Sequence, residues 1–379
     1  MEVSNAEVRA PSNSSIGRVA ELDSLRGVAA VAVVCHHCRN AFWTALPHWY
    51  FQPFFAGHEA VILFFVLSGY VLSLPMWANK IAAYPEYLAR RVSRIYLPYL
   101  AAAVVAGIGC YFFVGSRLPL TPWFYETWQT PLSVWVVWQQ LVMDPQPVLN
   151  TAFWSLRYEM EMSLIFPFLC LLMVRMGRHS GLFLVAATGI SAYLLFRIGA
   201  GPTNLGQTIY YSTSFIAGAA LSRERETLKR VIGDIRAHLL WLMLLLSIGA
   251  YCYGPFVSPV QRATDLLTML GSCGVILLIQ DPRLRVGLKS PVAEYLGRIS
   301  YSSYLIHGTI LFVGLNLLYG KVSMMLFAAI YGVTTLIAAH LFCIFIEEPS
   351  LRLGRRLAKR MQQRKTLQMP LTKKALRVE

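Results

Sequence analysis

The chain contains 379 residues, of which 56% are hydrophobic and only 14% are charged, and its mean hydropathy is +0.51. This composition excludes a large soluble domain and indicates an integral membrane protein with many spans. The net charge of +15 comes from basic residues scattered over short loops, which is typical of membrane topology rather than of nucleic-acid binding. We therefore expect membrane lipids, and no nucleic acid, among its partners.

The two ends of the chain are polar, and the region between them is apolar. Residues 1–20 lack the apolar core and cleavage site of a signal peptide, so the first apolar run is predicted to be retained as a span. Basic residues without apolar periodicity follow the last run and predict a disordered, lipid-touching extension. The expected parts are a cytoplasmic tail (1–20), a transmembrane domain (21–350) and a basic cytoplasmic tail (351–379).

Ten apolar runs approach the roughly 20 residues that cross a bilayer as a helix. The predicted fold is therefore all-α, a polytopic membrane protein with about ten transmembrane helices. A shorter run at 133–143 contains two tryptophans and two glutamines and predicts an interfacial or re-entrant segment, or else a further span. The ten predicted spans are about 24–43, 54–75, 95–114, 153–174, 181–198, 207–222, 237–253, 263–280, 299–319 and 322–346.

Lysine and arginine predict the orientation of these spans. The N-terminus, the alternate loops and the C-terminal tail carry 28 of the 34 Lys and Arg residues. Because cytoplasmic loops are enriched in these residues, both termini are predicted to be cytoplasmic, in a multi-pass protein of the plasma (inner) membrane.

The first span contains an arginine and a histidine that share one helix face. Arg26 and His37 are eleven residues apart, which at about 100° per residue is close to three full turns and roughly 16 Å along the axis. An ionisable residue inside a span indicates function, although a histidine that only packs against a neighbouring helix is the alternative. His36 points elsewhere and is the less favoured base. Residues 35–38 read CHHC, but consecutive helical residues cannot close on one ion, so no metal is expected.

Further polar groups recur at the predicted ends of the spans. Arg91 and Arg94, spaced i, i+3, share a face on the side where Arg26 lies, and three guanidiniums suit a phosphorylated donor; the alternative is a topology signal alone. Ser68 and Gly69 end an apolar stretch and permit close helix packing.

The chain resembles the membrane-bound acyltransferase family 3, the multi-span O-acyltransferases of surface glycans. The resemblance runs from about residue 21 to residue 352 and rests on six ordered motifs. They are LDSLRGVAAVAVVCHH (22–37), FFVLSG (64–69), RRVSRIYLPY (90–99), WSLRYE (154–159), LGRISYSSYLIH (297–308, with the histidine at 307) and EEP (347–349).

The resemblance assigns expected roles to particular residues. His37 is the catalytic base, and Glu159, which matches the family motif, is paired with it to fix its tautomer, in preference to Glu161. Ser68 and Gly69 either line a tunnel for the thin arm of the donor or only pack helices. Donor binding is expected from Arg26, Arg91, Arg94, Ser68 and Gly69, and acceptor binding from Glu59, Trp154, Tyr304 and His307.

The expected function is transfer of an acyl group, from cytoplasmic acetyl-CoA or another acyl-CoA, to a hydroxyl of a lipid-linked or surface glycan. No permanently bound cofactor is expected, and a separate acyl hand-off protein is a possible partner. His37 acts either as a base in a ternary complex or as the carrier of the acyl group. The alternatives are acylation of a small lipid or metabolite and, in a different class, a proton-coupled transporter.

Overall fold

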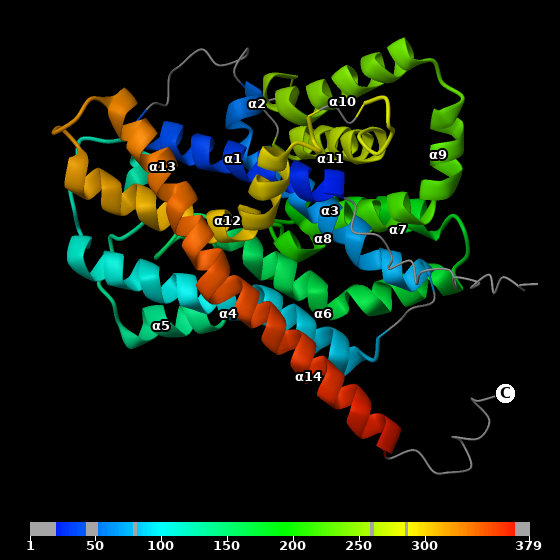
Figure 1. Ribbon diagram of the computed structural model, residues 1–379, viewed down its shortest axis with the longest axis horizontal. Coiled ribbons are helices and arrows are strands. Elements are labelled where there is room, and N and C mark those ends of the chain that lie inside the picture. The colour runs from blue at the N-terminus through cyan, green and yellow to red at the C-terminus, as the bar shows by residue number, and fades with distance from the viewer. Residues whose placement is uncertain (1–19, 43–51, 79–81, 258–260, 285–286, 368–379) are drawn as a thin grey trace, which may run out of the picture.

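The structure is a computed structural model that describes residues 20–42, 52–78, 82–257, 261–284 and 287–367. Within these ranges the chain is all-helical and has no strand, as predicted (Figure 1). Ten of the helices coincide in order with the ten predicted apolar runs. They are α1 (Ala20–Phe42), α3 (Gly57–Trp77), α4 (Tyr84–Phe113), α6 (Trp154–Arg175), α7 (Ser180–Arg197), α8 (Asn204–Arg223), α10 (Ala237–Val257), α11 (Gln261–Leu278), α12 (Pro291–Leu318) and α13 (Met324–Phe342).

The remaining elements are short or amphipathic. The run at 133–143 forms α5, which has only 8 residues and is too short to span a bilayer. Its two tryptophans, Trp135 and Trp138, are exposed, which fits an interfacial segment. The full set of short or amphipathic elements is α2 (Gln52–Phe55), the 3₁₀ turn η2 (Pro122–Glu126), α5 (Val134–Leu141), α9 (Arg225–Gly233), the π-helical turn η3 (Cys343–Glu347) and α14 (Glu348–Leu367).

Six helices of the described chain are both long and apolar enough to cross a membrane, which is fewer than the ten spans predicted. They are α3, α4, α7, α10, α12 and the continuous helix that starts with α13. The other four, α1, α6, α8 and α11, are long enough but carry charged, imidazole or hydroxyl side chains that lower their hydropathy. Such groups are tolerated in a membrane where they face the interior of a helical bundle.

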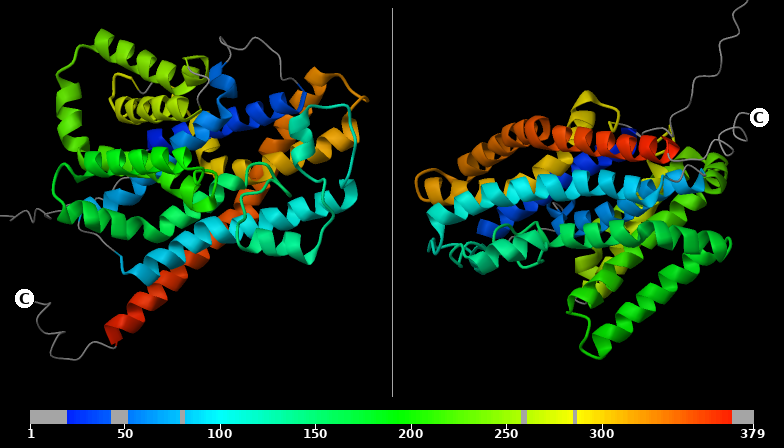
Figure 2. Two further views of the ribbon diagram at one scale, coloured as in Figure 1. Left: turned by 180° about the vertical axis from the view of Figure 1, so that it is seen from behind. Right: turned by 90° about the horizontal axis from the view of Figure 1, so that it is seen from below.

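The predicted disordered tail is wrong for residues 352–367, which are helical. The π-helical turn joins α13 to α14 without a break, so that one helix continues into the basic segment. Both views of Figure 2 show α14 in red running beside α4, and Figure 1 and the left view of Figure 2 show it extending past the bundle. The helix forms because Ala358 is buried and Gly354 approaches α4, while its arginines remain exposed.

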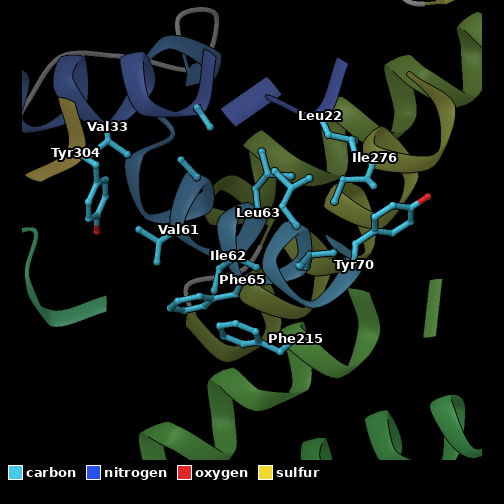
Figure 3. Close-up of a cluster of buried hydrophobic side chains, with 14 of the residues drawn as sticks. Leu22, Val33, Val61, Ile62, Leu63, Phe65, Tyr70, Phe215, Ile276 and Tyr304 are labelled. Carbon is cyan, nitrogen blue, oxygen red and sulfur yellow. The ribbon is translucent and has the colours of Figure 1, made fainter. Parts of the chain in front are cut away.

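The packing centre of the bundle is α3, which contacts α1, α6, α8 and α11. Figure 3 shows its buried side chains, including Phe65 beside Phe215 of α8, with ring centroids 5.0 Å apart. The two helices cross closely because each has a glycine at the contact. A Cβ at Gly69 would lie 1.9 Å from the Phe215 carbonyl oxygen, and one at Gly218 would lie 2.0 Å from that of Val66.

Candidate active site

A basic cavity of about 710 Å³ opens between α1, α3, α4, α6, α12 and α14. All three arginines predicted to bind the donor, Arg26, Arg91 and Arg94, line it, as does Ser68. Gly69 does not line this cavity and packs against α8 instead, and a tunnel role for it stays a prediction. The helix-packing alternative explains that glycine.

Carboxylates and hydroxyls hold two of the three arginines in place. Arg26 donates to Asp23 one helical turn earlier, with 2.7 Å between the nitrogen and oxygen. Arg91 is buried and donates to the Ser163 hydroxyl at 2.9 and 3.1 Å and to the Glu159 carboxylate at 3.4 Å. These guanidiniums are therefore preorganised at the cavity wall.

The predicted pairing of Glu159 with His37 is wrong. Glu159 faces Arg91 and lines the basic cavity, because an arginine on α4 is a stronger partner for a carboxylate in an apolar layer than a neutral imidazole. Glu161, the less favoured candidate, forms an ion pair with Arg157 at 2.9 Å and accepts from Thr208.

The partner of His37 is a second histidine. The Nδ1 atom of His37 lies 2.8 Å from Nε2 of His307, and the two rings are stacked at 5.0 Å. Nδ1 of His307 lies 3.0 Å from the Ser303 carbonyl oxygen. A carbonyl only accepts, so His307 carries its proton on Nδ1 and accepts at Nε2. His37 must then donate from Nδ1, which leaves its Nε2 lone pair available as a base.

His36 lines the same small cavity as His37, with ring centroids 5.6 Å apart, but it is held by the Phe55 backbone and the Asn40 side chain. Its Nδ1 lies 2.7 Å from the Phe55 carbonyl oxygen, and its Nε2 lies 2.9 Å from the Asn40 amide nitrogen. Both ring nitrogens are occupied, which supports the prediction that His37 rather than His36 is the base.

A second, smaller cavity of about 250 Å³ contains the imidazole of His37. Aromatic and imidazole groups from several elements surround it, including Trp123 and Trp154. Trp154 is one of the four residues predicted to bind the acceptor. The ring of Trp123 lies 5.2 Å from that of His37. We call this space the histidine cavity, and the first the basic cavity.

Val61 and Tyr304 line both cavities and form the wall between them. Tyr304 is buried; it donates to the Ala152 carbonyl at 3.0 Å and accepts from the Ser155 hydroxyl at 2.6 Å. The two residues of α12 that were predicted to bind the acceptor thus have different positions. His307 contacts the imidazole of His37, and Tyr304 lies between the cavities.

The connection between α4 and α6 covers the histidine cavity. Trp123 lies in its 3₁₀ turn, and Thr121 donates to the Asn40 carbonyl at the end of α1. Asn150 ties the other end of the connection to the Leu305 carbonyl of α12, at 3.2 Å. The prediction from sequence missed Trp123 because the preceding loop has no helical periodicity; its dense aromatic content was the available signal.

His58 also lines the histidine cavity, whereas its neighbour Glu59, predicted to bind the acceptor, lines neither cavity. Nε2 of His58 lies 2.9 Å from the Asp265 carboxylate, and its ring stacks on Trp154 at 6.2 Å. Asp265 also accepts from Tyr210 at 2.7 Å. Glu59 is buried beside Gln52, at 3.5 Å. Of these two neighbours, only His58 lines the cavity that contains His37.

The two cavities together can hold two reactants, with the imidazole of His37 in the smaller one. Arginines on one side suit phosphates, and a basic imidazole nitrogen on the other can deprotonate a hydroxyl. Within the described residues no group of His, Cys, Asp and Glu is arranged to hold a metal ion.

Comparison with known proteins identifies a family and two relatives. Residues 19–344 match the family described as "Acyltransferase domain", and five of the six sequence motifs lie inside that range. The acyltransferase MdmB of Streptomyces mycarofaciens is 27% identical over 390 residues, covering 89% of this chain and 93% of the relative. The O-acetyltransferase PaAT-1 of Phomopsis amygdali is 23% identical over 361 residues, covering 76% and 71%. No solved structure matches the chain.

Proposed function

Because the chain belongs to the acyltransferase family that it matches over residues 19–344, we propose that it is a membrane O-acetyltransferase that uses acetyl-CoA and a hydroxyl acceptor. The observation that carries this proposal is the His37–His307 pair, which orients a basic nitrogen beside the wall between two cavities. The Phomopsis relative is named as an O-acetyltransferase, which supports the choice of acyl group.

The basic cavity suits the donor. CoA carries phosphates at its nucleotide end and its thioester at the tip of a thin, flexible arm. Guanidiniums bind phosphates through two parallel hydrogen bonds. We place the nucleotide in the basic cavity and the arm between Val61 and Tyr304, so that the thioester reaches His37.

The chemical step needs one positioned base. Nε2 of His37 takes the proton of the acceptor hydroxyl as its oxygen attacks the thioester carbonyl carbon. The carbon–sulfur bond then breaks, the sulfur leaves with the electron pair, and the proton on His37 passes to it. The products are an O-acyl ester and CoA with a free thiol. The Nδ1 hydrogen bond to His307 keeps the ring oriented throughout.

Direct transfer in a ternary complex is favoured over an acyl-histidine intermediate. Val61 and Tyr304 line both cavities, so a donor arm that passes between them brings the thioester to the acceptor without a carrier. Bringing both reactants to one base is itself a large source of catalysis.

The acceptor is proposed to be a lipid-linked or surface glycan that presents one sugar to the histidine cavity. A cavity of about 250 Å³ holds a single ring rather than a polymer. The same volume favours a second candidate, a small lipid or metabolite, and both classes are compared in the experiment below.

The membrane arrangement is proposed to consist of ten spans with both termini in the cytoplasm. The six apolar helices together with α1, α6, α8 and α11 make up these spans, and the distribution of Lys and Arg gives the orientation. The basic cavity then opens to the cytoplasm, where CoA is available.

The test compares cells with and without the gene, and cells carrying the His37→Ala variant, by mass spectrometry of surface glycans, lipids and small metabolites. A species heavier by one acetyl group should appear only with the unaltered gene. Binding of CoA to the purified protein is measured in parallel. Absence of both the acetylated species and CoA binding would favour the transporter class instead.

A further inference from the structure

Two arginines outside the family match line the basic cavity. Arg352 and Arg355 belong to α14, beyond residue 344 where the family match ends, yet both are part of the cavity wall together with Arg94 of α4. None of the sequence motifs includes them. Their position at the cavity therefore comes from the three-dimensional packing of α14.

Close packing fixes α14 against α4. A Cβ at Gly354 would lie 2.7 Å from the Ser93 Cβ and 3.3 Å from the Ala89 carbonyl oxygen, and Ala358, one turn later, is 1% exposed. Ser93 immediately precedes Arg94, and Gly354 immediately precedes Arg355. With α14 held in this position, Arg94 and Arg355 both line the basic cavity.

The charges around the cavity separate into paired and unpaired groups. Arg26 pairs with Asp23 at 2.7 Å, Arg91 with Glu159 at 3.4 Å and Arg298 with Glu348 at 2.5 Å. Within the described part of the chain, the remaining cavity arginines, Arg94, Arg352 and Arg355, have no carboxylate within 4 Å. Glu347 nevertheless interacts electrostatically with Arg94, and Glu348 with Arg352 and Arg355. Arg352 donates only to the Glu348 backbone carbonyl, at 3.4 Å.

We propose that Arg94, Arg352 and Arg355 form a phosphate subsite for the 3′-phosphate of the donor's nucleotide. This inference rests on the proposed CoA donor. Arg352 and Arg355 are exposed, so they lie at the mouth of the cavity, where the end of CoA farthest from the thioester must sit. Guanidiniums without a direct carboxylate contact are available for a phosphate without first breaking an ion pair.

The same phosphate chemistry could be supplied by an anionic lipid headgroup, because α14 is basic along its whole length. Its other arginines provide matched controls. Arg356 is adjacent to Arg355, exposed and on the same helix, but it does not line the cavity. If replacing Arg355 weakens CoA binding and replacing Arg356 does not, the effect comes from the position of Arg355 at the cavity and not from the general charge of α14.

The experiment measures binding of CoA and of 3′-dephospho-CoA to the full-length protein, by calorimetry in nanodiscs of zwitterionic lipid. Loss of one charge-assisted contact should weaken CoA binding about tenfold in Arg355→Ala and in Arg352→Ala, with dephospho-CoA binding unchanged. Arg356→Ala should leave both affinities unchanged. Gly354→Val, which displaces α14 from Ser93, should reproduce the selective loss for CoA.

Each other outcome overturns the inference in a distinguishable way. Equal losses for CoA and dephospho-CoA would place these arginines on another donor group. Unchanged CoA binding, with Arg355→Ala altering affinity only in nanodiscs containing anionic lipid, would assign them to the headgroup. If the unaltered protein binds neither nucleotide, the proposed donor itself is wrong.

Discussion

At the scale of single residues, the hydrogen bonds of one imidazole decide which nitrogen can act. The Ser303 carbonyl fixes the proton of His307 on Nδ1, and this in turn fixes the proton of His37 on Nδ1. A carboxylate partner was expected for His37, as in many hydrolytic sites. A neutral histidine performs the same orienting task and avoids a second charge in an apolar layer.

His37→Ala should abolish acyl transfer, whereas His36→Ala should retain substantial activity. A general base contributes about 10²–10⁴-fold, and both ring nitrogens of His36 are occupied by the Phe55 carbonyl and Asn40. Release of CoA thiol and formation of the acetylated product are measured on purified protein, with CoA binding as the control for folding. Near-normal transfer by a folded His37→Ala protein would show that the base is another residue.

His307 should act through His37 and not on the substrate. His307→Leu removes the acceptor of the His37 Nδ1 proton and should lower transfer about 10- to 100-fold, the cost of leaving a buried polar group unpaired. His307→Gln supplies a carbonyl oxygen and should restore part of that loss. The measurement is kcat at saturating acetyl-CoA. Equal activity of the two variants would contradict an orienting hydrogen bond.

At the scale of elements, sequence periodicity predicted the helices but not their partners. The ten apolar runs coincide with ten helices because burial in a membrane demands long, backbone-satisfied segments. The spacing of Arg91 and Arg94 placed both at one cavity. Which arginine meets Glu159 depends on how α4 and α6 cross, and local sequence does not contain that information.

The connection from α4 to α6 should exclude water from the histidine cavity. Trp123 packs against His37 and against Phe312 of α12, with ring centroids 5.7 Å apart. Trp123→Ala should open the cavity, so that water replaces the acceptor and acetyl-CoA is hydrolysed without product ester. The ratio of released CoA thiol to ester measures this uncoupling. Trp135→Ala, an exposed tryptophan of α5, is the matched control and should remain coupled.

Gly69 should be required for stability and not for donor affinity. A larger side chain there meets the Phe215 backbone, and overpacking of this kind costs about 1–3 kcal/mol. Gly69→Ala should therefore lower the apparent thermal midpoint in detergent, while any folded fraction binds CoA normally. Gly332→Ala in α13, where a Cβ meets nothing within 4 Å, should not lower it. A weaker CoA affinity without loss of stability would support the tunnel role for Gly69.

At the scale of the whole molecule, the polar residues of the site lower the hydropathy of the helices that carry them. Four of the long helices, α1, α6, α8 and α11, fall below the apolar criterion. Helix α1 provides Arg26 and His37, and α6 provides Glu159. Helix α8 provides Thr208, the partner of Glu161, and α11 provides Asp265, the partner of His58. The sequence identified these segments as apolar runs, but only the packed structure shows that their polar faces point inward and pair with one another. The basic extension was mispredicted because its contacts with α4 depend on a single glycine and alanine.

Orientation is the property of the whole molecule on which the proposed mechanism depends. Reporter fusions at residues 12 and 368 should both report a cytoplasmic location, because 28 of the 34 Lys and Arg residues lie on that side. A third fusion in the α4–α6 connection, after Thr130, should report the opposite side, since one pass of α4 separates it from the basic cavity. If the two termini report different sides, the number of spans is odd. If all three locations are reversed, the arginines face away from cytoplasmic CoA, and the donor would have to approach His37 from the opposite face.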